Sequence, residues 1–366
     1  MKDRILFVMH ELNLGGAERV VTNLINNFSL ELYEVHLCLF RKKGVLVNEV
    51  REEIIIHDLE AKRVLNGTFA YYKLILDLKP DVVFTSITHV NLLTSILIPL
   101  LRFRIKANFI TREVNNPSVR ASHKFTSRLL DVFYKFSITN FDYIIAQSNY
   151  MKQDIIRHYA VKEDKIAVVP NPLDVGSITC KLNLDGEKYF FDRSKKNILA
   201  VGGLRKQKGF EKLLEVFKLL DDTYQLSIVG EGPERKYLEM KIAEFGLENK
   251  VKLLGKKQNP YVYMRDCDML MISSKYEGFP NVVIEANICG KFVIANDCPG
   301  IDSEIINRGL NGIILDFDKP ELIAEYVNVN FCKIKDTKVP VECTSRYEVK
   351  KVAEMHHKII VNHSNK

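Results

Sequence analysis

Short apolar runs alternate with amphipathic segments along most of the chain, as in a parallel sheet covered by helices. In the first half, the runs that predict buried strands are residues 5–9, 34–40, 53–59, 81–85, 106–111, 143–147 and 166–169. In the second half, they are residues 197–201, 225–229, 251–254, 269–273, 292–296 and 312–315. Segments with helical periodicity lie between them, at residues 17–28, 71–78, 125–136, 210–220, 234–245, 261–266, 281–288, 320–327 and 346–361. The alternation predicts an α/β fold with open, doubly wound parallel sheets.

The pattern is interrupted near the middle of the chain. Pro170, Asn171 and Pro172 break it, and the polar residues 173–196 show no clear period. We therefore expect two Rossmann-like domains, an N-terminal one at residues 1–174 and a C-terminal one at residues 175–345. Residues 346–366 are expected to form a C-terminal helix that packs back on the N-terminal domain.

Length and composition agree with this division. The chain has 366 residues, of which 46% are hydrophobic and 27% charged, which is too long for one ordinary core. No apolar run reaches the roughly 18 residues that suggest a membrane-spanning helix. The first residues enter a strand almost at once and lack the features of a signal peptide. We expect a protein without a membrane span, in the cytoplasm.

The cysteines and the net charge argue against a zinc-binding protein and against nucleic-acid binding driven by total charge. The seven cysteines are scattered and include no CxxC pair, which indicates a reducing compartment and disfavours structural zinc. The net charge of +7 is modest for this length, so nucleic-acid binding would need a local patch.

The most informative stretch is residues 272–290. Two carboxylates, Glu277 and Glu285, have seven residues between them, on either side of a predicted loop and helix start at Pro280. Free N–H groups at such a helix start, with the helix dipole behind them, suit a phosphate. Glu285 would lie about one turn inside the helix, where it could accept hydrogen bonds from a sugar diol. An ordinary strand, loop and helix with two solvated glutamates is the alternative.

Other loops at strand ends carry glycine and basic residues. Gly15 and Gly16 follow the first strand, but the GxGxxG fingerprint of dinucleotide-binding proteins is absent. Ligands of such sheets bind outside the carboxyl ends of the strands. Two sheets facing each other across a cleft would bring together loop residues that suit a diphosphate with a polyhydroxyl group: Gly15, Gly16, His89, Arg112, Glu113, Arg205, Lys208 and 277–283.

Four motifs then resemble those of the retaining glycosyltransferases of family 4, the group 1 glycosyltransferases, which have the two-domain GT-B fold. The motifs are NLGGAERVV, VGGLRKQKGFEKLL, IVGEGPER and SSKYEGFPNVVIEA, in the family's order and spacing. The resemblance covers nearly the whole chain and is strongest over residues 197–327.

The resemblance implies a role for each matching position. Glu277 would lie near the donor sugar, and Glu285 would hold the ribose hydroxyls of the nucleotide. Lys208 would bind the diphosphate as a cation, and Gly16 would allow the phosphate to approach the N-terminal domain. The donor sugar would face the backbone of Gly278, Phe279 and Pro280, and the diphosphate that of Asn281, Val282 and Val283.

Two positions depart from the family pattern. The family often has arginine where this chain has Gly203, and we expect Arg205 to reach the same phosphate. The family also often has a histidine after the fifth strand, where this chain has Arg112 and Glu113. These two residues are possible substrate contacts, as is His89, while His10 and His89 can equally be ordinary loop histidines.

No metal or other cofactor is expected. Of two DxD strings, the one at residues 316–318 follows a strand and precedes a helix that starts with proline, so a turn and a cap explain it. The one at residues 266–268 lies just before the apolar strand at 269. A positive cluster with a helix dipole can carry the leaving diphosphate without Mg²⁺, as the GT-B resemblance also implies.

The predicted activity is transfer of a sugar from a nucleotide diphosphate sugar, by default a UDP-sugar, to a hydroxyl with retained configuration. A sugar-nucleotide-binding protein without turnover is an alternative, disfavoured by the presence of Glu277. A nucleotide-sugar 2-epimerase on the same architecture is another.

A basic segment with aromatic residues suggests the partner. Residues 102–135 contain eight basic and two acidic residues. Aromatic residues are interleaved with them, including Phe103, Phe133 and Tyr134, and Phe136 follows directly. This composition fits docking on an anionic membrane, with nucleic acid disfavoured because no binding motif accompanies it. We expect a peripheral protein on the inner face of the cell membrane, acting on a saccharide linked to a lipid such as a polyprenyl diphosphate in surface polysaccharide or glycan assembly. A soluble acceptor, with the helix merely packed on its own sheet, is the alternative.

Overall fold

Each half of the chain forms its own α/β unit in the computed structural model. The structure describes residues 2–13, 15–120, 125–183, 191–302 and 304–364, with the backbone alone at 119, 120, 125–130 and 361–364. Unit 1 consists of Met1–Leu173 with Tyr347–Lys366, and unit 2 of Asp174–Arg346. These boundaries lie within one residue of those expected from the sequence.

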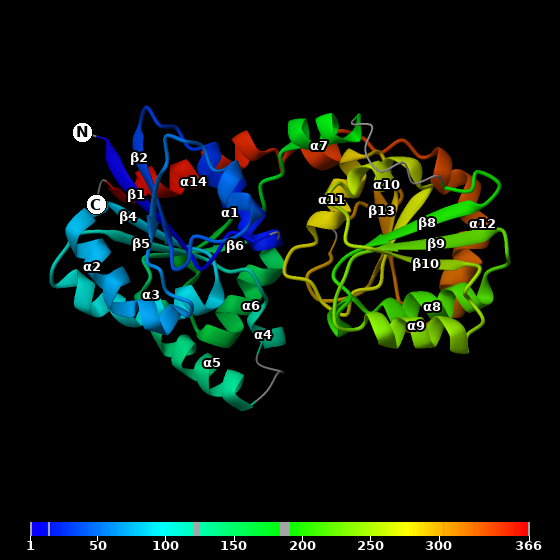
Figure 1. Cartoon of the computed structure of the whole chain (residues 1–366), viewed down its shortest axis with the longest axis horizontal. Helices are drawn as coiled ribbons and strands as arrows, with labels where there is room; N and C mark the ends of the chain where they lie inside the picture. Colours follow the sequence, from blue (N-terminus) through cyan, green and yellow to red (C-terminus); the bar gives the residue numbers. More distant parts are fainter. Residues whose placement is uncertain (1, 14, 121–124, 184–190, 303, 365–366) are drawn as a thin grey trace. The chain divides into compact units, whose positions relative to one another are not determined.

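Unit 1 is built on a seven-stranded sheet in which all neighbouring strands are parallel (Figure 1). In spatial order the strands are β3 (Ile55–Asp58), β2 (Tyr33–Leu39), β1 (Asp3–Met9), β4 (Val82–Thr85), β5 (Asn108–Arg112), β6 (Tyr143–Ala146) and β7 (Ile166–Val168). Most of the described strand residues are buried, because helices cover both faces of a parallel sheet.

The helices of unit 1 divide between the two faces of its sheet. One apolar core includes residues of α2 (Thr68–Leu78), α3 (Thr88–Arg102), α5 (Phe125–Ser137) and α6 (Asn149–Tyr159). The other includes residues of α1 (Gly16–Asn26) and of α14 (Val349–Ser364), the helix that follows unit 2 in sequence. The short helix α4 (Pro117–Arg120) contacts α6.

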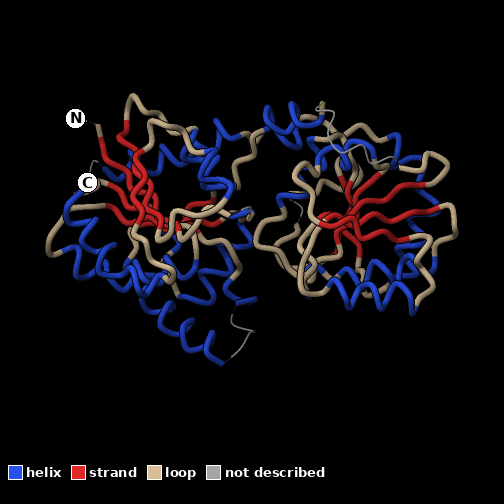
Figure 2. The backbone as a smooth tube through the Cα atoms, in the orientation of Figure 1, coloured by secondary structure: helices blue, strands red, loops and turns tan. Residues whose placement is uncertain are grey.

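Unit 2 repeats the design with a six-stranded parallel sheet (Figure 2). In spatial order the strands are β10 (Val251–Gly255), β9 (Tyr224–Val229), β8 (Lys196–Val201), β11 (Met269–Ile272), β12 (Val293–Asn296) and β13 (Gly312–Leu315). One apolar core includes residues of α8 (Phe210–Leu219), α9 (Arg235–Glu244) and α12 (Pro320–Asp336). The other helices are α7 (Val175–Leu182), α10 (Tyr261–Asp266), α11 (Asn281–Ile288) and α13 (Glu342–Ser345).

The strand pattern of the sequence is confirmed, but several helices differ from the prediction, among them α6, α7 and α12. Helix α6 was not predicted, and α7 lies inside the stretch expected to be irregular. Both have a side-chain cap: Ser148 accepts a hydrogen bond from the amide of Met151, and Asp174 from that of Ser177. Helix α12 runs nine residues beyond the expected end at 327, to Asp336.

In each sheet the strand order reverses beside the first strand. The reversal lies between β1 and β4 in unit 1 and between β8 and β11 in unit 2. Loops at the carboxyl ends of such strands diverge and leave a crevice for a ligand. The predicted site residues follow these strands: Gly16 and His89 in unit 1, Arg205, Lys208 and Glu277 in unit 2.

Candidate active site

In unit 2 the loops after β8 and β11 are joined by hydrogen bonds. The Ser273 hydroxyl donates to the carbonyl of Lys208 over 2.9 Å, and the Lys275 amide donates to the carbonyl of Gln207 over 2.8 Å. Gly209 has a φ of +59°, and a Cβ there would lie 2.3 Å from the carbonyl oxygen of Ser273. Only glycine allows this approach, which explains why a glycine follows Lys208 in the sequence.

Two of the three residues expected to act on the donor in unit 2, Lys208 and Glu277, form an ion pair. The Lys208 Nζ lies 2.6 Å from Oε1 of Glu277, whose side chain is 7% exposed, against 23% for the lysine side chain. The Ser274 hydroxyl donates to the same carboxylate oxygen over 2.5 Å. The sequence pattern predicted both partners of the pair but gave no role to Ser274.

Glu277 is held in place by a loop that the sequence did not single out. Its amide donates to the carbonyl of Pro299 over 2.8 Å. Gly300 has a φ of +87°, and a Cβ there would lie 1.9 Å from the carbonyl oxygen of Glu277. Burial raises the pKa of the neighbouring Cys298 thiol to about 12, with the charges of Glu277 and Asp297 adding to the shift. This thiol therefore stays neutral beside the carboxylate at physiological pH.

The loop after β8 that carries Arg205 and Lys208 lies against two glycines. A Cβ on Gly202 would be 3.4 Å from Cδ and Cε of Lys208, so the lysine stem passes over this glycine. A Cβ on Gly203 would be 3.8 Å from Nε of the exposed Arg205. The Arg205 side chain thus lies near Gly203, the position where the family often has arginine.

The start of α11 corrects one expectation. The three amides at residues 281–283 were expected to point freely out of the helix, but the Asn281 amide donates to the Phe279 carbonyl over 3.0 Å. The Val283 amide donates to the Pro280 carbonyl over 2.9 Å. A tight turn before the helix uses these donors, and Val283 is fully buried. At the other end Gly290 has a φ of +73°, which agrees with the predicted helix stop.

The remaining predicted donor residues lie on the same loop and helix. Half-buried are Gly278, Phe279, Asn281, Val282 and Glu285, while Pro280 and Val283 are buried. Glu285 lies one turn inside α11, as its spacing predicted.

In unit 1 the expected loops surround a pair of histidines. The rings of His10 and His89 meet edge to face with centroids 5.2 Å apart. Burial lowers the pKa of His89, and the charge of His10 lowers it further. Gly16 is the exposed first residue of α1. The Glu18 side chain folds back over Gly15, and burial raises the pKa of its carboxyl group.

Arg112 and Glu113 are buried in unit 1, with 1% and 0% of their surfaces exposed. Arg112 donates to Ser86 Oγ over 3.0 Å and to Asn171 Oδ1. Glu113 accepts from the hydroxyl of Tyr134 and, over 3.3 Å, from the amide of Asn91. In this structure both side chains serve the packing of unit 1 and offer no exposed surface to a substrate.

The two DxD strings have structural partners. Asp268 accepts from the Asn197 amide over 2.7 Å, and Asp266 pairs with Arg265. Asp316 accepts from the Asp318 amide over 2.9 Å just before α12, whose first turn contains Pro320. Among the residues that the structure describes, no three His, Cys, Asp or Glu side chains gather as a metal site would require.

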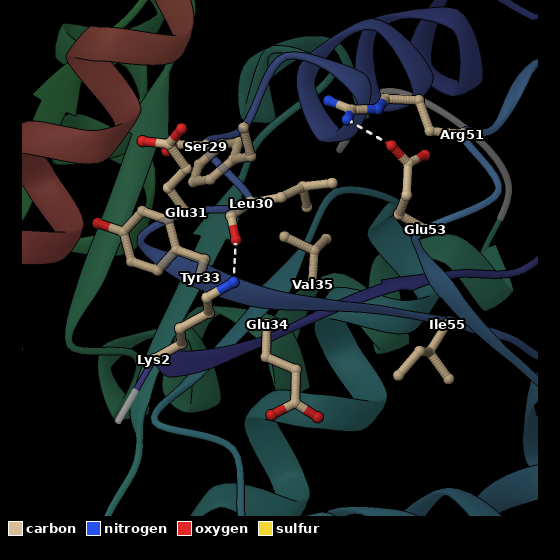
Figure 3. Close-up of a pocket in the computed structure, with 11 residues that line it drawn as sticks. Lys2, Ser29, Leu30, Glu31, Tyr33, Glu34, Val35, Arg51, Glu53 and Ile55 are labelled. Carbon is tan, nitrogen blue, oxygen red and sulfur yellow. Dashed lines mark hydrogen bonds and ion pairs between the residues drawn. The ribbon is translucent and has the colours of Figure 1, made fainter.

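A cavity of about 860 Å³ lies elsewhere in unit 1 (Figure 3). It is lined at the amino ends of β1, β2 and β3 by residues such as Lys2, Tyr33 and Ile55. Predicted ligand-binding loops follow the carboxyl ends of the strands, and none of the predicted site residues lines this cavity.

Two family models match consecutive parts of the chain. "Glycosyltransferase Family 4" matches residues 14–177 and "Glycosyl transferases group 1" matches residues 184–329. A relative from Campylobacter jejuni is 29% identical over 85% of both chains. It is named N-acetylgalactosamine-N,N'-diacetylbacillosaminyl-diphospho-undecaprenol 4-alpha-N-acetylgalactosaminyltransferase. The amylovoran biosynthesis glycosyltransferase AmsD of Erwinia amylovora is 26% identical over 86% of both chains.

Solved structures share the fold across both units. HepE from Anabaena, crystallised in complex with UDP, has a TM-score of 0.77 at 17% identity, covering 99% of this chain and 100% of that one. TarM has a TM-score of 0.79 at 13% identity, covering 100% of this chain and 99% of that one. The fold is therefore GT-B, and the protein is an enzyme that transfers sugars. The chain belongs to the group 1 glycosyltransferases of family 4, which confirms the resemblance seen in its motifs.

Proposed function

We propose that this glycosyltransferase moves a sugar, with retention of configuration, from a UDP-sugar to a hydroxyl of a lipid-linked saccharide. The observation that carries the donor half of the proposal is the meeting of Lys208 and Glu277 at the reversal point of the unit 2 sheet. A cation and a carboxylate there suit a diphosphate and the adjoining sugar hydroxyls. UDP as the nucleotide is supported by the complexes solved for HepE.

In this proposal the leaving diphosphate is stabilised by charge. Lys208 and Arg205 act on the negative charge that develops as the bond to the sugar breaks. The acceptor hydroxyl passes its proton to the leaving phosphate oxygen, so no separate protein base is required. No metal is required either, because the two cations supply the charge that Mg²⁺ would otherwise provide.

The lipid-linked acceptor is supported by the printed name of the Campylobacter relative, which includes a diphospho-undecaprenol carrier. A surface of unit 1 offers independent support. Helices α3 and α5 contact each other and are joined through the hydroxyls of Ser95 and Ser137, 2.7 Å apart. Among the side chains that the structure describes there, these helices and the residue after α3 expose six apolar ones: Ile96, Leu100, Phe103, Val132, Phe133 and Phe136. We call this set the α3–α5 face.

Exposed basic residues adjoin the α3–α5 face in sequence. They are Arg102, Arg104, Lys106 and Lys135, of which Arg102 pairs with Asp142 over 2.6 Å. Apolar side chains with cations beside them suit an anionic bilayer surface. Tyr134, by contrast, is buried, and the side chains of Arg120, Lys124 and Arg128 lie outside the described residues. No helix within the described ranges has the length and apolar content to cross a bilayer. The proposal places the enzyme on the cytoplasmic surface of a membrane.

The test is a transfer assay with a synthetic polyprenyl-diphosphate saccharide and single UDP- or GDP-sugars, with and without EDTA. We expect a UDP-sugar to be consumed, EDTA to have no effect, and the anomeric configuration of the donor to appear in the product by NMR. An inverted product, or activity lost with EDTA and restored by Mn²⁺, would contradict the mechanism. Release of an epimerised sugar without acceptor would favour the epimerase alternative.

A further inference from the structure

One oxygen of Glu277 accepts hydrogen bonds from two donors of different kinds. Lys208 Nζ is 2.6 Å and Ser274 Oγ is 2.5 Å from Oε1. The lysine reaches the carboxylate from another loop on a long, partly exposed side chain, while Ser274 is 1% exposed and precedes Glu277 by three residues. The carboxylate therefore has one donor on a long, partly exposed side chain and another on a short, buried one.

Ser274 is itself fixed by the strands beside it. Its carbonyl accepts a hydrogen bond from Nδ2 of Asn296 over 2.8 Å. Asn296 is 3% exposed at the end of β12, and its Oδ1 accepts from the amide of Phe317 over 3.0 Å, just after β13. A chain of hydrogen bonds thus runs from the sheet edge through Asn296 and Ser274 to the Glu277 carboxylate.

The two donors respond differently to a bound diphosphate. The Lys208 ammonium group would be drawn to the phosphate charge, which removes one donor from Glu277. A buried carboxylate that loses one donor depends more on the hydrogen bonds that remain to keep its position, and the bond from Ser274 is one of them. A serine hydroxyl has one short side-chain torsion and no charge to offer the phosphate, so it can remain in place.

We propose that Ser274 is a positioning residue for Glu277, which holds the carboxylate in its working orientation when Lys208 turns to the donor diphosphate. This inference rests on the proposed function, in which Lys208 binds the diphosphate and Glu277 lies near the donor sugar. It assigns to the Ser274 hydroxyl a task in turnover and none in nucleotide binding.

The test compares Ser274→Ala with Glu277→Gln and with the double variant. Loss of a hydrogen bond to a charged group corresponds to about a 10- to 100-fold lower kcat for Ser274→Ala, with the Kd for UDP changed less than about twofold. In the Glu277→Gln background, Ser274→Ala should have almost no further effect, because the hydroxyl acts through that carboxylate. Ser274→Thr, which keeps a hydroxyl, should recover much of the activity.

Ser227→Ala is the matched control, since Ser227 is a fully buried serine on β9, two strands from β11. It should leave kcat unchanged. The proposal is overturned if Ser274→Ala keeps wild-type kcat, or loses kcat and UDP affinity together. It is also overturned if Ser274→Ala lowers kcat by the same factor in both backgrounds. All variants are assayed with whichever donor the wild-type enzyme uses, so a wrong donor assignment changes the assay substrate and leaves this comparison intact.

Discussion

Arg112 donates a hydrogen bond from Nη2 to Oδ1 of Asn171, the residue between the two prolines at the end of unit 1. The arginine is fully buried, and burial lowers its pKa to about 10, against an opposing effect of Glu113. Strand β5 is thereby tied to the segment through which the chain leaves unit 1. Arg112, which the sequence offered as a substrate contact, thus has a part in the framework of unit 1.

His356 on α14 lies within electrostatic reach of Arg112 and makes the stability of unit 1 depend on pH. Burial lowers the pKa of His356 to about 4, the Arg112 charge lowers it further, and a hydrogen bond with the Val352 carbonyl opposes the shift. The His356 imidazole is protonated near pH 6.5 in the unfolded chain and only near pH 4 in the folded one. The free energy of unfolding of unit 1 therefore has its full value, as far as His356 is concerned, above about pH 6.5. It decreases as the pH falls, by roughly 3 kcal/mol at pH 4.

Hydrogen exchange of unit 1 amides at pH 5 and pH 7 measures this loss. In His356→Gln the titrating group is gone, so the fall in stability between the two pH values should shrink. An unchanged fall would assign the pH dependence to other groups.

Glu285→Ala should weaken UDP binding by about 1–3 kcal/mol, because a carboxylate that accepts from the ribose hydroxyls is removed. Isothermal titration calorimetry measures the effect. Glu325→Ala on α12 is the control, since Glu325 is an exposed glutamate of the same unit. If Glu285→Ala binds UDP and GDP as tightly as the wild type binds each of them, Glu285 does not hold the ribose.

Lys208→Met should lower kcat by about 10²- to 10³-fold, the scale of removing one group that stabilises developing charge. Arg205→Met should have a smaller effect, because Arg205 is exposed to solvent where Lys208 is partly buried. Lys206→Met changes an exposed lysine of the same loop and serves as the control for net charge. Steady-state kinetics with the natural donor distinguish the three, and equal losses for Lys206 and Lys208 would argue against a specific diphosphate contact.

Phe103→Glu with Phe136→Glu should reduce binding to anionic vesicles by tenfold or more, since two phenylalanines that are 87% and 73% exposed become charged. Co-sedimentation at low and high salt measures it, with neutral vesicles in parallel. Val329→Glu in unit 2, at a residue that is 76% exposed, is the control. Wild-type binding by the double variant, or no binding by the wild type, would favour a soluble acceptor.

The periodicity of apolar residues predicted the strands well because parallel strands are buried on both faces and read as short apolar runs. It failed at α6, whose sequence is largely polar, and at the short helix α7, and single side chains at Ser148 and Asp174 set the starts of these helices. The Ser148 cap was available as a sequence signal, while α7 contains Gly176 and several weak helix formers.

The candidate site was predictable where local spacing decides it. The positions of Glu277 and Glu285 follow from one loop and one helix, and the family motif supplied Lys208. The supports could not be predicted in the same way. Asn296 reaches Ser274 and Gly300 reaches Glu277, from the strand and the loop that follow α11, and only the paired register of β11 and β12 brings them near. Fewer amides at the start of α11 are free to bind a phosphate than the sequence suggested, because two of them already donate hydrogen bonds within the turn before the helix.

The return of α14 to unit 1 has a consequence for synthesis on the ribosome. Its residues Val352, Ala353 and Ile360 belong to the same apolar core as α1. The amide of Leu173, the last residue before unit 2, donates a hydrogen bond to the carbonyl of Tyr347, the first residue after it. All of unit 2 is translated before this helix emerges, so unit 2 can fold during translation while one face of the unit 1 sheet has α1 but still lacks α14. A chain stopped after residue 346 would contain an intact second unit beside a first unit that exposes apolar surface and invites chaperones or proteases.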